Sequence, residues 1–499
     1  MQRLNPLSLR ATVPAAVAHP RYDRAALEPG IVHLGIGAFM RAHLAVATDS
    51  AIHATGDLRW GIVGVSLRQA DTRDALAPQG GLYTVCVRES DGEGGVRETL
   101  QVIGCVQRVI VAPDDPQAVL DAIAAPATRI VSLTITEKGY GLDPATRKSR
   151  LDTPEHAHDL RDPHAPRSAA GFIVRGLAHR RAAGLAGITL MSLDNLASNG
   201  HALRALVLDF ARALDRDLAS WIDTTCTFPC SMVDRIVPRT TDADRARVAQ
   251  ALGAHDAWPV VTEAFFDWAV EDHFAAGRPA WTHQPGARLV PDAAPWECLK
   301  LRMVNGTHST IAYLAVAAGW ATVDEAIAQP ALRGFIEALM REEIEPTLPA
   351  LPGFDVGAYR RQLLARFANP ALAHKTMQIA MDGSQKLPPR LLGTVRDRLA
   401  KGQPIPRLAF AIAAWLNHLR GHDDAHRAYT IDDPLAAQLT ELARKLDSAA
   451  NASERAAVAL AFAPVFGDVP ASDALRHALA AALERLRTRG AMAALNEQA

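Results

Sequence analysis

The sequence predicts an α/β protein in which a doubly wound parallel-sheet domain is followed by a mostly α-helical domain. In the first half, short runs rich in Val, Ile and Leu alternate with segments whose apolar residues have helical spacing. A glycine-rich turn directly follows the first of these runs. After about residue 290, strand-like runs disappear and helix-like segments follow one another. These three observations indicate a parallel sheet covered by helices and then an all-helical part.

Four short apolar runs in the first half predict strands buried on both faces, because such strands are apolar throughout rather than alternating. The runs cover residues 30–34, 60–66, 129–135 and 187–193. A helix is expected at 169–183, between the last two. Residues 82–87 and 98–111 indicate two more strands on either side of the turn-like residues 91–95. These two lie too close in sequence for a helical crossover, so we expect an antiparallel excursion.

The second half predicts helices separated by proline-bearing stretches. The expected helices cover residues 301–318, 331–340, 358–367, 408–419, 434–446, 452–466 and 472–486. The change from alternating strand-like and helix-like segments to helix-like segments alone falls within 279–295. We therefore place the two domains at residues 1–288 and 289–499.

The composition is that of an ordinary globular protein, with 49% hydrophobic and 21% charged residues and a formal net charge of -1. Nothing in this balance indicates a nucleic acid or a membrane surface as a partner. The N-terminus lacks a signal-peptide pattern and no apolar run is long enough to span a membrane, so we expect a cytoplasmic protein. Five scattered cysteines predict reduced thiols, and Cys226 and Cys230 lack a second ligand pair, so no metal is expected.

A glycine-rich turn after the first strand suggests a site for a dinucleotide. A strand, a glycine turn and a helix let backbone N–H groups approach a pyrophosphate. The third glycine of the usual pattern is replaced by Met40, so an ordinary tight turn is the alternative. The residues expected to contact the cofactor here are Gly35, Ile36, Gly37, Ala38, Phe39 and Arg41.

The choice between NAD and NADP depends on the segment after the second strand. An acidic residue there would bind the adenosine ribose and favour NAD, and Asp71 is the candidate. Asp71 could equally cap a helix that carries Asp74 in its first turn, and Arg68 could instead bind a 2′-phosphate. We favour NAD.

The segment from Glu297 to His308 suggests alcohol–carbonyl chemistry. In a helix, Lys300 and His308 would lie near one side, with Glu297 one turn before the lysine. A desolvated lysine takes and returns a proton when its pKa falls from ~10.4 towards ~7–8. The amide of Asn305 would donate to a developing alkoxide. The alternative is a surface helix with a solvated lysine, and composition alone favours that alternative.

Six segments, in order along the chain, resemble the polyol-specific long-chain dehydrogenases, the family of mannitol 2-dehydrogenase and fructuronate reductase. The segments are IVHLGIGAFMRAH (31–43), LTITEKGY (133–140), SLDNLASNG (192–200), FPCSMVDRIVP (228–238), the lysine segment (300–308) and QIAMDGSQKLPPR (378–390). The resemblance implies a Rossmann-type N-terminal domain and a mostly helical C-terminal domain that work without a metal. It also implies a monomer or a small homo-oligomer.

The resemblance assigns roles to particular residues. Lys300 would be the general acid/base, and Asn195 and Asn305 would polarise the reacting carbonyl. His308 would orient the substrate and Glu297 would relay the proton. The remaining expected contacts are Glu137 and Lys138 to the cofactor and Lys386 and Arg390 to the substrate.

The resemblance implies an NAD-dependent oxidoreductase acting on a small sugar-like substrate. Gln378 and Lys138 resemble the fructuronate reductase branch more than the mannitol branch. A uronate also needs a cation beyond Lys300, and Lys386, Arg390 and Arg302 are available. We therefore expect interconversion of D-fructuronate and D-mannonate, with mannitol oxidation to fructose as the alternative. A dinucleotide-binding sensor without chemistry is a rival from another class.

Overall fold

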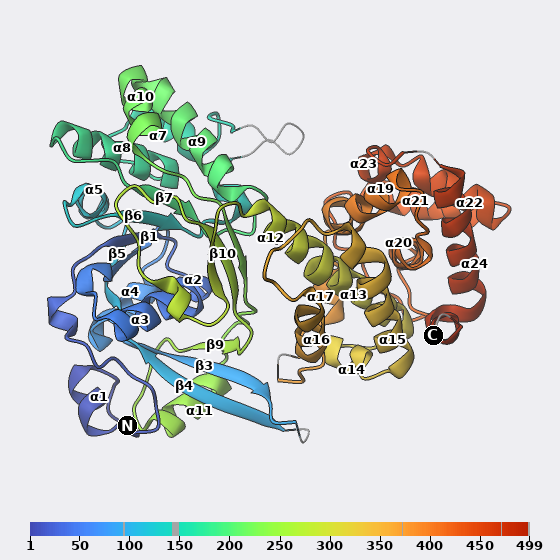
Figure 1. Ribbon diagram of the computed structural model, residues 1–499, viewed down its shortest axis with the longest axis horizontal. Coiled ribbons are helices and arrows are strands. Elements are labelled where there is room, and N and C mark those ends of the chain that lie inside the picture. The colour runs from blue at the N-terminus through green and yellow to red at the C-terminus, as the bar shows by residue number, and fades with distance from the viewer. Residues whose placement is uncertain (93–94, 142–148, 372, 471, 498–499) are drawn as a thin grey trace. The chain divides into compact units, whose positions relative to one another are not determined.

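The chain divides into two compact units. The computed structural model describes residues 1–92, 95–141, 149–371, 373–470 and 472–497. The first unit comprises Met1–Glu89 and Val96–Ala294, and the second comprises Ser90–Gly95 and Pro295–Ala499 (Figure 1). No helix within the described ranges is both long enough and apolar enough to cross a membrane.

The first unit is built on a five-stranded parallel sheet, as predicted. The strands in spatial order are β5 (Val106–Val111), β2 (Ile62–Ser66), β1 (Ile31–Leu34), β6 (Ile130–Leu133) and β7 (Thr189–Ser192), and every neighbouring pair is parallel. The strands after β1 are therefore added first on its β2 side and then, beginning with β6, on its opposite side. In open α/β sheets, ligands bind at the carboxyl ends of the strands where this direction reverses.

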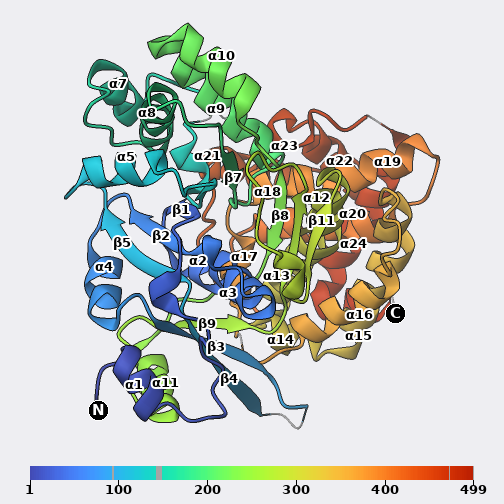
Figure 2. The ribbon, with the colours of Figure 1, turned by 60° about the vertical axis from the view of Figure 1, so that its left-hand side comes forward.

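Helices cover both faces of this sheet, so the expected doubly wound arrangement is confirmed (Figures 1 and 2). Successive residues of β1 point into different cores: Ile31 joins one cluster, and Val32 and Leu34 join the other. One core is completed by α5 (Pro116–Ala124), α8 (Ala169–Ala182), α9 (Asn199–Leu214) and α10 (Arg216–Thr225). The other is completed by α2 (Ala38–Ala42), α3 (Leu44–Thr55) and α4 (Asp71–Leu76).

The single strand expected at 98–111 is wrong, because two strands occupy this stretch. It divides into β4 (Val96–Ile103) and β5 at Gly104, where an added Cβ would lie 2.2 Å from the Pro20 ring. β5 pairs with β2 in the parallel sheet. Of these two strands, only β4 lies outside the parallel sheet. It belongs to a separate three-stranded sheet in the order β4, β3 (Tyr83–Ser90) and β9 (Val260–Glu263). Residues 93–94 of the expected turn lie outside the described ranges.

A second three-stranded sheet of the first unit was not predicted. Its strands are β11 (Ala287–Val290), β10 (Asp267–Glu271) and β8 (Ser231–Asp234). Each has four or five residues, and two of them end in acidic side chains. So short a run with polar ends resembles a loop in sequence, and pairing with a neighbouring strand decides its conformation.

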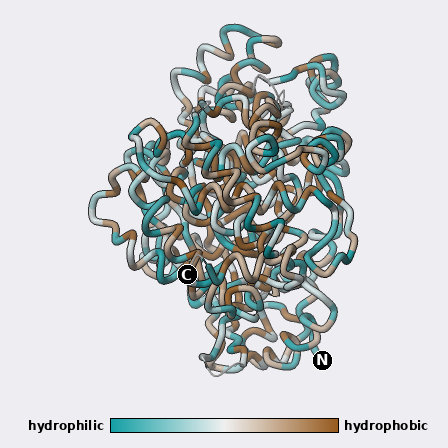
Figure 3. Tube along the Cα trace, turned by 90° about the vertical axis from the view of Figure 1, so that its right-hand side faces the viewer, coloured by the Kyte–Doolittle hydropathy of each residue, from teal (hydrophilic) through white to brown (hydrophobic). Residues whose placement is uncertain are grey.

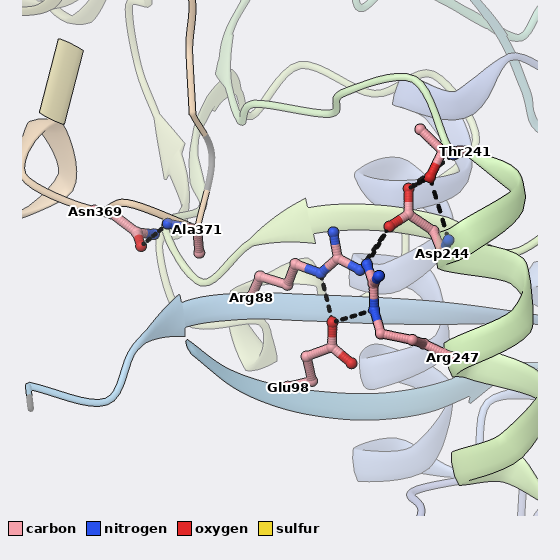
Figure 4. A network of polar contacts seen from close by, with 7 residues as sticks. All are labelled: Arg88, Glu98, Thr241, Asp244, Arg247, Asn369 and Ala371. Atoms are coloured by element: carbon pink, nitrogen blue, oxygen red, sulfur yellow. Dashed lines mark hydrogen bonds and ion pairs between the residues drawn. The ribbon is translucent and has the colours of Figure 1, made fainter. Parts of the chain in front are cut away.

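Figure 4 shows a network of charged residues beside the sheet formed by β4, β3 and β9. Arg88 donates to Glu98 at 2.6 Å and to Asp244 at 2.8 Å. Burial opposes ionisation of Asp244, but hydrogen bonds from Thr241 and Arg88 lower its pKa to about 2. Arg247 also pairs with Asp244. Because opposite charges neutralise one another here, we assign this network to the fold and not to a ligand site.

The second unit is helical, as predicted. Its α-helices are α12 (Ala294–Leu299), α13 (Thr307–Ala318), α14 (Val323–Ile327), α15 (Pro330–Ala338), α16 (Val356–Phe367), α17 (Thr376–Ala380), α18 (Gly383–Leu387), α19 (Gly393–Ala400), α20 (Pro406–His418), α21 (Ala436–Ser448), α22 (Ala452–Leu460), α23 (Ala463–Phe466) and α24 (Asp473–Asn496). The helix expected at 452–466 divides before α23, which begins with a proline in its first turn. Along the trace in Figure 3, short apolar stretches alternate with polar ones.

Three segments of the second unit have π-helical hydrogen bonding. They are η5 (Lys300–Gly306), η6 (Leu339–Ile344) and η8 (Pro388–Leu392). The regular helix expected at 301–318 is therefore wrong for its first six residues, which belong to η5. η5 packs against both η6 and η8. Such i→i+5 turns are rare and occur frequently at functional sites.

Candidate active site

The glycine turn of the first unit depends on a glycine at position 35. Gly35 has φ +92°, and its N–H and that of Ile36 donate to the carbonyl of Val65 on β2. A Cβ on Gly35 would lie 2.1 Å from the Thr134 carbonyl oxygen. No side chain other than hydrogen fits this conformation and this space. The turn therefore stays close to both β2 and the segment after β6.

Gly37 has an exposed position with open space in front of it. A Cβ added there would meet nothing nearer than the Gly35 carbonyl oxygen, at 3.9 Å. Ile36 points the other way: it is buried, and a Cβ on Gly64 of β2 would lie 2.2 Å from its Cδ1. The backbone at Gly37 is thus free of steric cover, whereas the side chain of Ile36 fills the core.

Arg41 is predicted to contact the cofactor, and the structure places its side chain inside the fold. Its guanidinium is buried, donates to the Trp258 carbonyl at 2.5 Å and lies over the ring of Tyr83. Burial lowers the pKa of Arg41 to about 10. These bonds hold the guanidinium inside the fold, and the predicted cofactor contact of Arg41 stays a prediction.

Asp71 is exposed and is the first residue of α4. The alternative that it caps this helix is wrong, because the N-cap residue is Ala70 and makes no side-chain capping bond. The Asp71 carboxylate instead accepts from the N–H of Thr72 at 2.8 Å. Arg68 is exposed as well.

Glu137 and Lys138 are exposed on α6 (Thr136–Gly139), the short turn that follows β6. The turn is held by Asp194, which lies just beyond β7. The Asp194 carboxylate accepts from the N–H groups of Ile135 at 3.1 Å and Thr136 at 2.9 Å. Burial raises the pKa of Asp194, and these hydrogen bonds oppose the rise.

Asn195 follows Asp194 and is exposed. Four residues further on, the Asn199 side chain donates to the carbonyls of Asp194 at 3.0 Å and Ser231 at 2.7 Å. Because β1, β6 and β7 are parallel, the glycine turn, the Glu137–Lys138 turn and the Asn195 loop all leave the same edge of the sheet. The structure therefore brings the candidate cofactor turns and Asn195 to one edge of the first unit, at the reversal between β1 and β6.

In the second unit, Lys300 begins η5 and is only 7% exposed. Asn305 lies in the same π segment, and His308 lies in the first turn of α13. In a regular α-helix, residues five apart point in different directions. The i→i+5 bonding of a π-helix brings such residues onto successive turns of one side, so Lys300 and Asn305 share a side of η5. Glu297 lies on α12 and is partly exposed.

A close backbone contact fixes η5 against η8. A Cβ on Gly306 would lie 2.6 Å from the Arg390 carbonyl oxygen. The Arg390 guanidinium donates to the Ser309 hydroxyl at 2.9 Å and to the Asn305 carbonyl at 3.5 Å. The predicted substrate residue Arg390 is therefore joined directly to the segment that carries Lys300 and Asn305.

His308 lies within a group of basic side chains, called here the basic cluster. Its ring is 4.9 Å from the ring of His374 and 5.4 Å from that of Phe367. Burial, followed by the neighbouring cations, lowers the pKa of His308 well below 6.5. The members of the basic cluster are His308, Arg366, His374, Lys386 and Arg390.

The cations of this region differ in how far they are neutralised. Arg302 forms an ion pair with Asp397 at 2.6 Å and donates to the Thr347 carbonyl, so it is engaged elsewhere. Lys386 lies 3.8 Å from Asp382, and burial lowers its pKa. In the part of the chain that the structure describes, Arg390 makes no ion pair. Of the three cations proposed from sequence, Arg302 has the shortest ion pair, at 2.6 Å.

Several residues of the two sites were missed by sequence reasoning. Asp194 and Asn199 lie inside the SLDNLASNG segment, and that segment was the signal available for them. Arg366 and His374 are far from Lys300 in sequence and had no signal of their own. Among the described residues, no three His, Cys, Asp or Glu side chains are grouped so that they could hold a metal.

Two family models match the chain. The mannitol dehydrogenase Rossmann domain matches residues 29–283, and the mannitol dehydrogenase C-terminal domain matches residues 292–487. The chain belongs to the mannitol dehydrogenase family. It is thus an oxidoreductase of the dehydrogenase class, as the resemblance of the six sequence segments implied.

Relatives with different substrates match over nearly the whole chain. D-mannonate oxidoreductase from Escherichia coli (strain K12) is 42% identical over 95% of this chain and 96% of that protein. Mannitol 2-dehydrogenase from Pyrenophora tritici-repentis is 38% identical over 97% of this chain and 84% of that protein. The structure of Pseudomonas fluorescens mannitol 2-dehydrogenase, a ternary complex with NAD and D-mannitol, is 35% identical with a TM-score of 0.82, covering 100% of this chain and 99% of that one.

Proposed function

We propose that this protein is an NAD-dependent oxidoreductase that interconverts D-fructuronate and D-mannonate. In the reducing direction, the ketone of fructuronate receives a hydride from NADH at carbon and a proton at oxygen, which gives mannonate and NAD+. The observation that carries the proposal is a buried lysine on a π-helical segment that is hydrogen-bonded, through the Asn305 carbonyl, to Arg390 of the basic cluster, in a member of the mannitol dehydrogenase family.

The first unit supports NAD as the cofactor. The glycine turn lies where the direction of the parallel sheet reverses, and the backbone at Gly37 is free of steric cover. The family member from Pseudomonas fluorescens has been solved with NAD. We assign the pyrophosphate contact to the backbone of residues 35–39, the ribose contact to Asp71, and further cofactor contacts to Glu137 and Lys138.

We assign proton transfer to Lys300 and stabilisation of the alkoxide to two asparagines. Bound NADH supplies the hydride. Lys300 gives a proton to the carbonyl oxygen as it becomes an alkoxide, and takes it back in the oxidising direction. The amides of Asn195 and Asn305 donate to the same oxygen and stabilise its developing charge.

His308 and Glu297 complete this assignment. The low pKa of His308 keeps its ring neutral near pH 7, so the imidazole both donates and accepts hydrogen bonds when it orients a substrate hydroxyl. Glu297, one turn before Lys300 and partly exposed, would pass the proton between the lysine and solvent.

The basic cluster supports a hexuronate as the substrate. A carboxylate in a partly buried site needs cationic donors, whereas a neutral hexitol needs only neutral donors and acceptors. Lys386 and Arg390 supply such donors next to His308, and Arg366 adds to the positive potential there. The D-mannonate oxidoreductase relative is consistent with this choice.

Oxidation of mannitol to fructose is the second candidate, because mannitol 2-dehydrogenases match at similar identity. Both reactions use a dinucleotide and one small molecule. We also propose that the enzyme is cytoplasmic and acts as a monomer or a small homo-oligomer.

A substrate panel tests this function. D-fructuronate and D-fructose are compared with NADH and with NADPH, and kcat/KM is measured for each pair. We expect NADH with fructuronate to give the highest value. Turnover of fructose without fructuronate would instead support the mannitol reaction, and NADH binding without any turnover would support the sensor.

A further inference from the structure

One buried carboxylate joins the candidate cofactor turn to the candidate carbonyl-polarising asparagine. Asp194, two residues beyond β7, is 8% exposed. Its Oδ1 accepts from the Thr136 N–H at 2.9 Å, and its Oδ2 accepts from the Ile135 N–H at 3.1 Å and the Tyr140 hydroxyl at 2.9 Å. Thr136 immediately precedes Glu137 and Lys138, and Asp194 immediately precedes Asn195.

The turn held by Asp194 has an unfavourable backbone conformation. Thr136 has φ +63°, in the left-handed region. A β-branched residue is disfavoured there, because its Cβ substituents crowd the backbone. Such residues persist only where surrounding contacts hold them, and they gather at functional sites. The bond from the Thr136 N–H to Asp194 is a contact of this kind.

The other side of Asn195 is also fixed. The Asn199 side chain donates to the Asp194 and Ser231 carbonyls, and its Oδ1 accepts from the Ser231 N–H at 2.9 Å. Ser231 begins β8. The exposed Asn195 therefore lies in a loop whose two ends are held, one by the turn after β6 and one by β8.

We propose that Asp194 is a positioning residue that couples the cofactor turn to Asn195, so that a cofactor seated on Glu137 and Lys138 fixes the amide that polarises the substrate carbonyl. The inference rests on the proposed function, since it takes the roles of these three residues from it. Asp194 itself touches neither substrate nor cofactor in this account. Its effect is exerted through the two turns that it ties together.

The test is Asp194→Asn, which keeps the size of the side chain. An amide offers a single carbonyl oxygen, so it cannot accept from Ile135 and Thr136 with two separate oxygens. We expect kcat per folded enzyme to fall by about 30-fold, less than for loss of a polarising donor itself. We also expect the KM for NADH to rise. The primary isotope effect on kcat, measured with NADH deuterated at the transferred position, should increase because hydride transfer becomes slower relative to other steps.

Asp159→Asn is the matched control. Asp159 is fully buried in the same unit and also accepts from two backbone N–H groups and a hydroxyl: Arg167 N at 2.9 Å, Ser168 N at 2.8 Å and Ser168 Oγ at 2.7 Å. It ties α7 (Pro154–Arg161) to the start of α8 and to neither candidate turn. We expect it to lower the melting temperature without changing the isotope effect.

The outcomes separate the inference from the function on which it rests. If wild-type enzyme shows no NADH-dependent turnover, the proposed function is wrong. If wild-type enzyme is active and Asp194→Asn behaves like Asp159→Asn, with a lower melting temperature and an unchanged isotope effect, the coupling is overturned.

Discussion

At the scale of single residues, Lys300 is notable because a lysine is rarely buried. Transfer of an ammonium group from water costs free energy unless it is paired or hydrogen-bonded. Here the fold keeps the side chain 7% exposed at the first position of a π-helical turn. Lys401, at the end of α19 in the same unit, is exposed to solvent. Lys300 and Lys401 can therefore be compared as a buried and an exposed lysine of the same unit.

We predict that Lys300→Ala lowers kcat by roughly three orders of magnitude, as expected when a general acid/base and its charge are both lost. NADH affinity should stay unchanged, because the cofactor contacts are assigned to the first unit. Lys401→Ala is the control and should leave both quantities as they are. Stopped-flow kinetics and NADH fluorescence titration measure the two effects, and an unchanged kcat in Lys300→Ala would remove the lysine from the mechanism.

Sequence reasoning reached some residues of the site and not others, for a physical reason. Lys300, Asn305 and His308 lie within nine residues, so local spacing and family resemblance both pointed to them. His374 lies two residues before α17 and reaches His308 because α17 packs against α13. Local sequence patterns do not show which helices pack together. The core position of Arg41 is likewise set by Trp258, more than two hundred residues away in sequence.

At the scale of elements, the contact between η5 and η8 depends on Gly306. Its φ is −64°, so the backbone itself would accept any residue. What a side chain would meet is the Arg390 carbonyl oxygen, 2.6 Å from an added Cβ. The glycine is therefore required for close approach of two π segments.

We predict that Gly306→Ala destabilises the protein by about 1–3 kcal/mol through overpacking and lowers kcat, because η5 carries Lys300 and Asn305. Gly334→Ala is the control, since Gly334 lies inside α15 with nothing within 4 Å of an added Cβ. This second change should stabilise the protein by about 0.5–1 kcal/mol, the gain in helix propensity. Thermal unfolding and kcat are measured together, and equal effects of the two substitutions would contradict the packing argument.

The glycine turn gives a second prediction at this scale. Gly37→Ala should leave the melting temperature nearly unchanged, because its φ of −87° suits alanine and no atom crowds the Cβ. NADH affinity should fall by about tenfold or more, since a methyl group would stand where the pyrophosphate approaches the backbone. Isothermal titration calorimetry measures the affinity. An unaltered dissociation constant would argue against pyrophosphate binding at this turn.

The elements that were predicted correctly are those whose burial is visible in the sequence. β1, β2, β6 and β7 are buried at every position and lie in short segments rich in apolar residues. β5 contains exposed and half-buried positions and follows β4 after two residues, so it resembled a continuation of that strand. The π segments have no distinct composition, since an i→i+5 turn results from packing and not from the periodicity of the sequence.

At the scale of the whole molecule, several histidines are buried in neutral form. Burial lowers the pKa of His33 to about 3 and that of His418 to about 4, and it lowers those of His308 and His374 as well. Unfolding exposes these rings, whose pKa then returns to about 6.5. Below that pH the unfolded chain binds more protons than the folded one, so stability falls as the pH decreases.

We therefore predict that the melting temperature decreases as the pH is lowered from 7 to 5. His53 has the opposite sign: Asp49 raises its pKa to about 9, so its contribution is complete below pH 6.5 and is lost as the pH rises through 9. His418→Phe should reduce the loss of stability at low pH, because the phenyl ring keeps the stacking on Tyr429 but binds no proton. Differential scanning calorimetry at several pH values measures the slope, and an identical slope in His418→Phe would exclude that residue as a contributor.

The most direct test of the proposed reaction is to measure hydride transfer from NADH to the sugar acid. Wild-type protein is incubated with D-fructuronate and NADH deuterated on its nicotinamide, and the product is analysed by mass spectrometry. We predict D-mannonate with one deuterium at the former ketone carbon for each NADH oxidised, and roughly a thousandfold slower product formation with Lys300→Ala. Fructuronate left unchanged, while fructose under the same conditions gives deuterated mannitol, would contradict it.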